Sequence, residues 1–268
     1  MMDISFLKDN GVNVDKSLEL FGDMNTYNST VGDFLVGASE KVPKLIKYKN
    51  DKDLSNYSIY AHSIKADARY FGFTKLEEIA FNHEQKSKEG DLYFIQSDFD
   101  NLINEVDRMT KVVKEYLEED SKEDEKEEEK SESTGVVYDN KTILVVDDSN
   151  IIRNFVSRIF KDEYTVGVAK DGQEAIDIIE ANKDNDQIKA ILLDLNMPKV
   201  DGFAVLEHMK EKDLFTKIPV SIISGDSSKE TIDKAFKYRI VDMLGKPFND
   251  KDVKRVVERT IQFNTMDA

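Results

Sequence analysis

The 268-residue chain contains no cysteine, which excludes disulfide bonds, thiolate metal sites and cysteine nucleophiles. No run approaches the roughly 18 consecutive apolar residues of a membrane span, and the opening MMDISFLKDN has neither the basic start nor the apolar core of a signal peptide. A formal net charge of -16 argues against direct contact with nucleic acid, because phosphate contacts need clustered Lys and Arg. We therefore expect a cytoplasmic protein with no membrane insertion and no nucleic-acid partner.

A run of charged residues marks a boundary near the middle of the chain. From Glu118 to Lys130 the sequence EEDSKEDEKEEEK contains no apolar residue, so this run has no apolar surface to bury. A chain of 268 residues is long enough for two domains of ordinary size. We expect a first domain over residues 1–117, an acidic linker over 118–140 and a second domain over 141–268.

The first domain shows no strand pattern, and its apolar residues recur at helical spacing. Short polar breaks separate the apolar segments, which predicts that neighbouring helices run antiparallel. The expected fold is an all-α, up-and-down helix bundle. Its expected helices are Met24–Tyr48, interrupted around Pro43, then Leu54–Phe71, Lys75–Ser87 and Tyr93–Leu117.

The second domain alternates apolar runs typical of buried strands with amphipathic segments typical of helices. This alternation predicts an α/β fold with a doubly wound, five-stranded parallel sheet. The expected strands are Thr142–Val146, Tyr164–Val168, Ala190–Leu193, Val220–Ser224 and Val241–Leu244. The expected helices are Ile151–Phe160, Gln173–Asn182, Ala204–Lys212, Lys229–Tyr238 and Lys251–Phe263.

Chemically capable side chains follow four of these predicted strands. Asp147 and Asp148 follow ILVV, Asp194 follows AILL, Ser224 follows VSII, and Lys246 comes just after the last strand. Because the carboxyl ends of parallel strands face one crevice, we expect these side chains to converge. Three packed carboxylates raise each other's pKa unless a cation joins them, and such hard oxygen ligands suit Mg²⁺. One carboxylate could then attack a phosphoryl group as a nucleophile.

A purely structural interpretation exists for each fragment. Asp147-Asp148 could cap the helix that follows, and Lys246-Pro247 could form an ordinary turn. Capping and turn formation, however, do not require several such fragments to end successive strands. We therefore favour the chemical interpretation.

In this order and on these strands, the fragments resemble the phosphorylation site of response-regulator receiver domains, over residues 141–263. The resemblance implies a flavodoxin-like strand order of 2-1-3-4-5 and identifies Asp194 as the phosphoacceptor. It also implies that Asp148 ligates Mg²⁺ directly, that Asp147 holds it through water, and that the backbone carbonyl of Asn196 completes the protein ligands.

The same resemblance gives roles to the cation and the hydroxyl. Lys246 would contact the phosphoryl oxygens, and the hydroxyl of Ser224 would move to meet them and so act as a switch. The bond between Lys246 and Pro247 is expected to be cis, which would aim the lysine into the crevice. Met243 stands where receivers commonly have Tyr or Phe, although a thioether side chain can still repack. Such a domain would promote its own phosphorylation and dephosphorylation.

One segment of the helix bundle, YAHSIKADARYFGF, carries a second candidate site. His62, Lys65 and Arg69 follow helical spacing on a ridge that we expect to be more exposed than the inward stripe of the same helix. A histidine there can accept a phosphoryl group, and the two cations would steady its charge. One step round the helix lies a predicted inward stripe of Ala61, Ile64, Ala68 and Phe71.

This segment resembles the phosphorylated helix of histidine-containing phosphotransfer (HPt) domains. In that family the histidine is followed at this spacing by a lysine, a small residue and a later glycine, which here are His62, Lys65, Ala66 and Gly72. Ala66 stands where Gly is commonest. The alternative is an interaction bundle whose histidine is not phosphorylated.

Together the two resemblances predict a two-component phosphorelay protein. No Gly-rich ATP-binding segment is recognisable, so the phosphoryl group would come from a small donor or from partners, namely a sensor histidine kinase and other receiver or HPt proteins. It would be accepted on Asp194 and exchanged with His62 or with partner proteins. His83 and His208 lie in charged helix surroundings that we expect to be exposed and that have no such ridge, and we interpret both as structural.

Two alternatives need no phosphorylated histidine. The first is a receiver-only switch, in which phosphorylation of Asp194 controls partner binding by the bundle. The second is a phosphate sink that drains a shared kinase. The receiver resemblance also allows a homodimer through its last two helices.

Overall fold

The computed structural model describes residues 4–120, 142–226 and 228–266. Residues up to 120 belong to one compact unit, and those from 142 onward belong to a second. The predicted acidic linker lies almost wholly outside the described residues, so the domain limits stay a prediction. None of the described helices combines the length and the apolar content that a membrane crossing needs.

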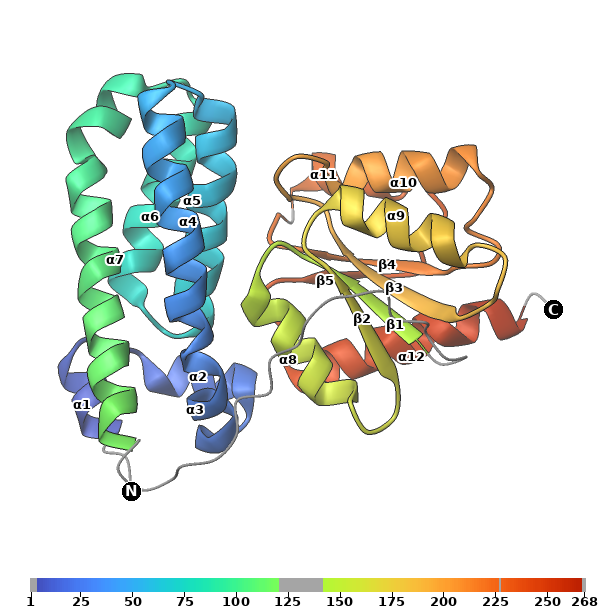
Figure 1. The fold of residues 1–268 in the computed structure, drawn as a ribbon, viewed down its shortest axis with the longest axis horizontal. Coiled ribbons are helices and arrows are strands. Elements are labelled where there is room, and N and C mark those ends of the chain that lie inside the picture. The colour runs from blue at the N-terminus through green and yellow to red at the C-terminus, as the bar shows by residue number, and fades with distance from the viewer. Residues whose placement is uncertain (1–3, 121–141, 227, 267–268) are drawn as a thin grey trace. The chain divides into compact units, whose positions relative to one another are not determined.

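The first unit is all-α in its described residues, as predicted. Its helices are α1 (Ile4–Asp9), α2 (Val14–Phe21), α3 (Met24–Val31), α4 (Asp33–Asn50), α5 (Leu54–Tyr70), α6 (Thr74–Lys88) and α7 (Leu92–Asp120). Figure 1 shows α4 to α7 packed side by side, with the short helices α1 to α3 gathered at one end of this unit. Side chains of Asn13, Asp23 and Asp53 accept backbone N–H groups at the starts of α2, α3 and α5, which satisfies donors that have no partner within the helix.

The prediction for the first of the long helices was wrong in two respects. The break falls at Gly32, between α3 and α4, and α4 continues through Pro43. Pro43 and Ser39 both lie on the exposed side of α4, where water can satisfy the carbonyl that the proline leaves without a backbone donor. The helices α1 and α2 were not predicted.

Aromatic rings fill the end of the bundle where α2 and α3 meet the turn after α5. Phe21 stacks on Phe71 with ring centroids 5.6 Å apart, and Phe34 meets Phe73 edge-on at 4.9 Å. The predicted inward stripe of α5 is buried, with Ala61, Ile64, Ala68 and Phe71 all at most 2% exposed. This packing fixes the rotation of α5, and therefore the direction of the face that carries His62.

The second unit is an α/β unit whose five strands form one parallel sheet in the order β2-β1-β3-β4-β5. The predicted doubly wound fold and its strand order are thus confirmed. The strands are β1 (Thr142–Val146), β2 (Thr165–Ala169), β3 (Ile188–Asp194), β4 (Val220–Ser224) and β5 (Met243–Gly245). The helices are α8 (Asn150–Phe160), α9 (Gly172–Asn182), α10 (Gly202–Glu211), α11 (Lys229–Ala235) and α12 (Asp250–Met266).

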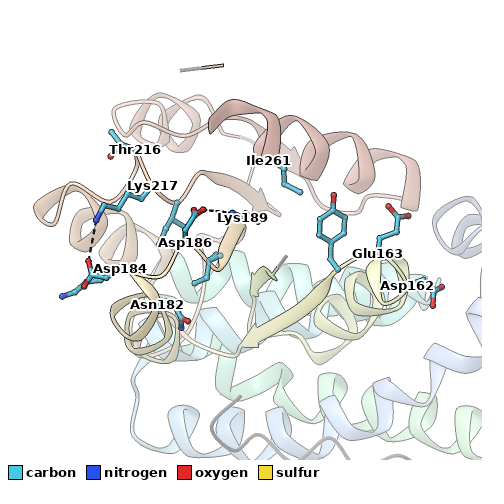
Figure 2. Close-up of a pocket in the computed structure, with 13 residues that line it drawn as sticks. Asp162, Glu163, Asn182, Asp184, Asp186, Lys189, Thr216, Lys217 and Ile261 are labelled. Carbon is cyan, nitrogen blue, oxygen red and sulfur yellow. Dashed lines mark hydrogen bonds and ion pairs between the residues drawn. The ribbon is translucent and has the colours of Figure 1, made fainter. Parts of the chain in front are cut away.

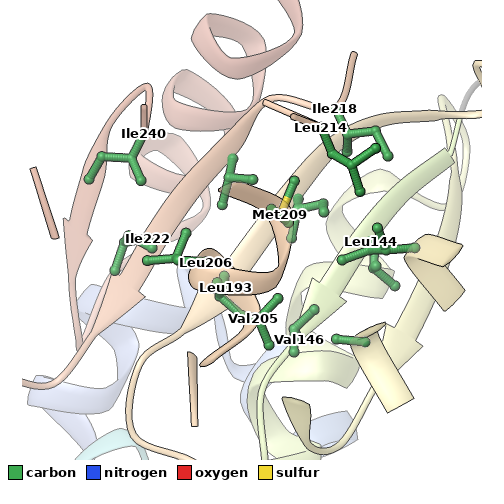
Figure 3. Packing of buried hydrophobic residues seen from close by; sticks show 14 of the residues in the cluster. Leu144, Val146, Leu193, Val205, Leu206, Met209, Leu214, Ile218, Ile222 and Ile240 are labelled. Atoms are coloured by element: carbon green, nitrogen blue, oxygen red, sulfur yellow. The ribbon is translucent and has the colours of Figure 1, made fainter. Parts of the chain in front are cut away.

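Helices cover both faces of this sheet, with α8 and α12 on one side and α9, α10 and α11 on the other (Figure 1). Every residue of β1 and β4 is buried, as expected for strands packed on both faces. Leu144, Leu193, Val205, Met209 and Ile222 belong to one buried cluster (Figure 3). Such a packed core holds the strand ends in fixed positions.

The predicted limits around α11 and β5 were displaced. The helix ends at Ala235 instead of Tyr238, and the fifth strand begins at Met243. Tyr238 packs against the buried cluster from the connection between them, and its hydroxyl donates to Glu207 Oε2 at 2.9 Å. The helical periodicity therefore assigned Tyr238 to a helix, whereas this side chain belongs to a loop that packs against the core.

Candidate functional site

The carboxyl ends of neighbouring strands bring the predicted acidic residues together. Asp147 directly follows β1, and Asp194 is the last residue of β3, the strand beside it in the sheet. The register pairs Val146 with Leu193, so both carboxylates emerge at one edge. Ligand oxygens of Asp147, Asp148 and Asp194 all lie within 4.8 Å of one another.

Lys246 lies between two of these carboxylates. Its backbone N–H donates to the carbonyl of Ser224 at 2.7 Å, and its peptide bond to Pro247 is cis. Its Nζ donates to Asp194 Oδ2 at 2.7 Å and lies 2.6 Å from Asp147 Oδ2. The side chains of Lys246, Asp147 and Asp194 are 6%, 0% and 2% exposed. The site thus holds a buried ammonium among three carboxylates.

Burial and crowding set the charge states in this cluster. Burial raises the pKa of the Asp147 carboxyl, and the neighbouring Asp194 and Asp148 raise it further against the opposing charge of Lys246. Burial would lower the pKa of Lys246, but Asp147 and Asp194 outweigh it and hold that pKa above its ordinary value. Asp147 Oδ2 is buried, and the charge that faces it is the ammonium of Lys246 at 2.6 Å. Because one ammonium faces three carboxylates, the donor set fits a divalent cation.

Backbone groups hold the two central carboxylates in place. Asp147 Oδ1 accepts the N–H of Ser149 at 2.9 Å, and Asp194 Oδ1 accepts the N–H of Asn196 at 3.2 Å. Arg153 Nη1 donates to the carbonyl of Asp147 at 2.6 Å. Sequence reasoning missed Arg153, because a residue in the first part of α8 gives no sign that its side chain turns back to the strand end.

The hydroxyl of Ser224 is buried at the start of the loop after β4. Its Oγ accepts the N–H of Asp226 at 3.1 Å, and Asp226 Oδ2 accepts the hydroxyl of Thr231 on α11 at 2.7 Å. Met243 is half-buried and packs against the core cluster of the sheet. The position that commonly carries an aromatic ring in receivers therefore carries a flexible thioether.

The second candidate site lies between α5 and α6. His62 is only 8% exposed, which is more than any residue of the inward stripe but still buried. Its Nδ1 lies 3.0 Å from Glu84 Oε1 and 3.3 Å from Lys65 Nζ. Glu84 is itself buried and accepts from Lys65 at 2.6 Å and from Lys88 at 2.6 Å. The reason for the burial is that α6 packs along α5 and places a carboxylate beside the ring.

Glu84 was missed by sequence reasoning, which considered the face of one helix alone. Burial would raise the pKa of Glu84, but hydrogen bonds from His62, Lys65 and Lys88 outweigh it and hold the pKa well below its ordinary value. Glu84 is therefore a carboxylate at neutral pH, which can only accept hydrogen bonds. A neutral His62 ring that donates to Glu84 carries its proton on Nδ1 and its lone pair on Nε2. Among the described residues, none is a hydrogen-bond partner of Nε2.

Arg69 and Gly72, two further residues of this segment, are each held by another part of the bundle. Arg69 Nε lies 2.9 Å from Glu77 Oε1, so its charge is already engaged. Gly72 has φ +73, and a Cβ there would lie 2.3 Å from the carbonyl oxygen of Asn13. Glycine is required at this position by a left-handed turn and a close backbone approach.

The remaining histidines make structural contacts, although His83 is fully buried where exposure was expected. His83 Nδ1 lies 2.8 Å from the hydroxyl of Tyr57, and its Nε2 lies 3.2 Å from Asp98 Oδ2. His208 Nε2 lies 2.7 Å from Glu180 Oε1, which links α10 to α9. Both interpretations as structural residues agree with these contacts.

A cavity of about 1080 Å³ lies at the opposite edge of the sheet. Its lining includes Glu163, Asp186 and Lys217, which come shortly before the amino ends of β2, β3 and β4 (Figure 2). The lining contains no predicted site residue. The acidic cluster at the carboxyl ends is thus separate from this cavity.

Residues 143–258 match the family model described as the response regulator receiver domain. The two-component response regulator ORR3 of Oryza sativa subsp. indica is 30% identical over 120 residues, which cover 44% of this chain and 89% of that protein. Protein-glutamate methylesterase/protein-glutamine glutaminase 1 of Methanospirillum hungatei JF-1 is 35% identical over 117 residues, which cover 42% of this chain and 33% of that protein. Among solved structures, chemotaxis protein CheY4 of Vibrio cholerae matches with 27% identity and a TM-score of 0.41, covering 45% of this chain and 98% of that one.

The chain therefore belongs to the response regulator receiver family, through its second unit. This membership supports a function in two-component signalling.

Proposed function

We propose that this protein is a phosphorelay component, which accepts a phosphoryl group on Asp194 and exchanges it with His62 or with partner proteins. The observation that carries the proposal is the convergence of three carboxylates, Lys246 and Ser224 at one edge of the sheet. Phosphoryl transfer needs a nucleophile, a cation beside it and a donor that can reach the phosphoryl oxygens, and this site offers a buried carboxylate, an ammonium and a hydroxyl. The proposed partners are a sensor histidine kinase and other receiver or HPt proteins, and the proposed location is the cytoplasm.

At the receiver site, an oxygen of Asp194 forms the new bond to phosphorus. The bond between phosphorus and the donor breaks, and its electron pair leaves with the donor. Lys246 Nζ, now 2.7 Å from Asp194 Oδ2, provides the cation for the phosphoryl oxygens. Asp147, Asp148, Asp194 and the backbone carbonyl of Asn196 would hold Mg²⁺, which when bound supplies further positive charge there.

At the bundle site, Nε2 of His62 is the nucleophile. Because Glu84 holds the proton on Nδ1, the lone pair of Nε2 is free to form the bond to phosphorus, and the ring becomes cationic. The Glu84 carboxylate, 3.0 Å from Nδ1, faces that positive charge. In the return step the bond between Nε2 and phosphorus breaks, and its electron pair returns to Nε2. Neutral imidazole is regained without transfer of a proton.

A second candidate function is a receiver-only switch. It is favoured by the 8% exposure of His62, which leaves less room for an incoming donor than an exposed ridge would. In that case phosphorylation of Asp194 alone would control how the bundle binds a partner.

The test is to find which residues carry phosphate after exposure to Mg²⁺ and phosphoramidate. The wild type, Asp194→Asn, His62→Gln and the control His208→Gln are compared by intact and peptide mass spectrometry under cold, neutral conditions. We expect phosphate on Asp194 and on His62, with the His62 share persisting in Asp194→Asn. Phosphate on Asp194 alone would support the receiver-only switch. A wild type with no phosphate on Asp194 would overturn both.

A further inference from the structure

The loop after Asp194, residues 195–201, closes tightly on the backbone of the phosphoacceptor. The N–H of Gly202 donates to the carbonyl of Leu195 at 3.1 Å. A Cβ at Gly202 would lie 2.1 Å from the carbonyl oxygen of Asp194. The same loop contains Asn196, whose N–H donates to Asp194 Oδ1. Any displacement of this loop therefore moves the carboxylate and the Asn196 carbonyl together.

The far side of the loop is attached to the start of α9. The N–H of Gly172 donates to the carbonyl of Val200 at 3.0 Å, and a Cβ at Gly172 would lie 2.5 Å from that oxygen. Beside this contact, Lys199 Nζ donates to Asp171 Oδ2 at 2.5 Å. The loop is thus joined to α9 by one backbone bond and one ion pair.

Asp171 is itself firmly positioned. Its side chain is 3% exposed, and its Oδ1 accepts the N–H groups of Gln173 and Glu174 at 3.1 Å as the N-cap of α9. Burial would raise its pKa, but the hydrogen bonds from Lys199 and the helix N–H groups outweigh it and hold the pKa below its ordinary value. Asp171 therefore offers a fixed negative charge to the loop.

Lys199 adopts an unfavourable backbone conformation in making this contact. Its φ is +66, in the left-handed region where a Cβ is disfavoured. Its side chain is 67% exposed even though its ammonium contacts Asp171, so burial of apolar surface does not explain the backbone conformation. Backbone strain of this kind persists where the surrounding contacts hold it, and it is concentrated near functional sites.

We propose that Asp171 and Lys199 are positioning residues for the phosphorylation site. Their ion pair holds the loop so that Asp194 and the carbonyl of Asn196 stand where a divalent cation and the phosphoryl group need them. This role rests on the proposed function of Asp194. Neither residue touches the reacting atoms, so both act through the loop, in the way that groups outside a metal site orient its ligands.

Three variants of the full chain separate this role from simple stabilisation. Asp171→Asn keeps an N-cap acceptor but removes the charge, and Lys199→Met removes the ammonium but keeps the stem. Lys199→Gly removes the ammonium and also relieves the positive φ. The matched control is Lys183→Met, which breaks the ion pair of Lys183 with Glu180 on α9 and does not involve the loop.

Each variant is measured for Mg²⁺ affinity by titration calorimetry, for the initial rate of phosphoryl uptake from phosphoramidate, and for its unfolding midpoint. In the uptake reaction an Asp194 oxygen bonds to phosphorus as the phosphorus–nitrogen bond breaks, and nitrogen leaves as ammonia after gaining a proton. We expect about tenfold weaker Mg²⁺ affinity in all three variants, slower uptake, and an unchanged midpoint for Lys199→Gly. The control is expected to match the wild type.

Two results would overturn the proposal. One is wild-type Mg²⁺ affinity in the Lys199 and Asp171 variants. The other is a loss of affinity that only accompanies a lower unfolding midpoint, since that would make the pair a structural contact. Failure of the proposed function would look different from failure of this positioning role. If the wild type binds Mg²⁺ but takes up no phosphoryl group, the proposed function fails, while the Mg²⁺ affinities of the variants still test whether the ion pair positions the loop.

Discussion

Replacing Lys246 with methionine removes the ammonium from a buried acidic cluster and leaves the volume of its stem. In the wild type this ammonium lies 2.6 and 2.7 Å from two carboxylates that are almost fully buried. Without it, the carboxylates of Asp147, Asp148 and Asp194 face each other with oxygens within 4.8 Å. At that separation and an effective dielectric constant of about 20, each charged pair repels by about 3.5 kcal/mol.

The protein can limit this repulsion, because one carboxylate can take up a proton. We therefore expect Lys246→Met to lower the free energy of unfolding by about 3–5 kcal/mol without metal, the range for breaking a buried ion pair. Added Mg²⁺ should stabilise this variant more than the wild type, since it no longer competes with the ammonium for the same carboxylates. Each tenfold gain in affinity would add about 1.4 kcal/mol at saturating metal. The deficit without metal should shrink as pH falls, because protonation removes the repulsion.

Hydrogen exchange of the amide groups in β1 and β3, followed by mass spectrometry, measures this stability in the second unit of the full chain. The matched control is Lys189→Met, which breaks a more exposed ion pair with Asp186 and should change the free energy of unfolding by less than about 0.5 kcal/mol. A Lys246→Met variant that is as stable as the wild type without metal would contradict this prediction. Weaker stabilisation of the variant than of the wild type by Mg²⁺ would contradict it as well.

Three further predictions concern the helix bundle. Glu84→Gln keeps an acceptor near His62 Nδ1 but removes the charge that faces the cationic ring, so phosphorylation of His62 by phosphoramidate should slow about fivefold, the difference between a charged and a neutral hydrogen bond; an unchanged rate by mass spectrometry would argue against that role. Burial lowers the pKa of His83 below its ordinary value of 6.5, against the opposing charge of Asp98, so the neutral ring contributes stability above pH 6.5 that is lost as the pH falls further. Between neutral and acidic pH, the melting temperature of His83→Gln should therefore fall less than that of the wild type, and an equal fall would contradict this. Lys41 and Asp67 form an ion pair with side chains 5% and 2% exposed, so Lys41→Met should cost about 3–5 kcal/mol in denaturant unfolding, whereas Lys41→Met with Asp67→Leu should recover most of it; equal costs for the single and double variants would show that the pair does not carry the effect.

The receiver half shows which structural features the local sequence pattern predicts correctly and which it does not. The strands β1 and β4 were predicted with their observed limits, because strands buried on both faces appear as continuous apolar runs. Parallel strands also place their carboxyl ends at one edge, so the approach of Asp147 to Asp194 follows from topology alone. The limits of α11 and β5 did not follow, because Tyr238 packs inward from a loop and its apolar character resembles that of a helical residue.

The residue pattern alone was therefore sufficient to predict the class of each unit, the parallel sheet and the residues that gather at its carboxyl edge. These features depend on period, order and residue type, which are properties of the chain alone. The packing of the folded chain was needed to show that Glu84 lies against His62, that Arg153 turns back to the carbonyl of Asp147, and that Lys199 reaches Asp171. Each of these contacts joins elements whose relative rotation is set by side-chain packing, and packing depends on the whole core rather than on any local spacing.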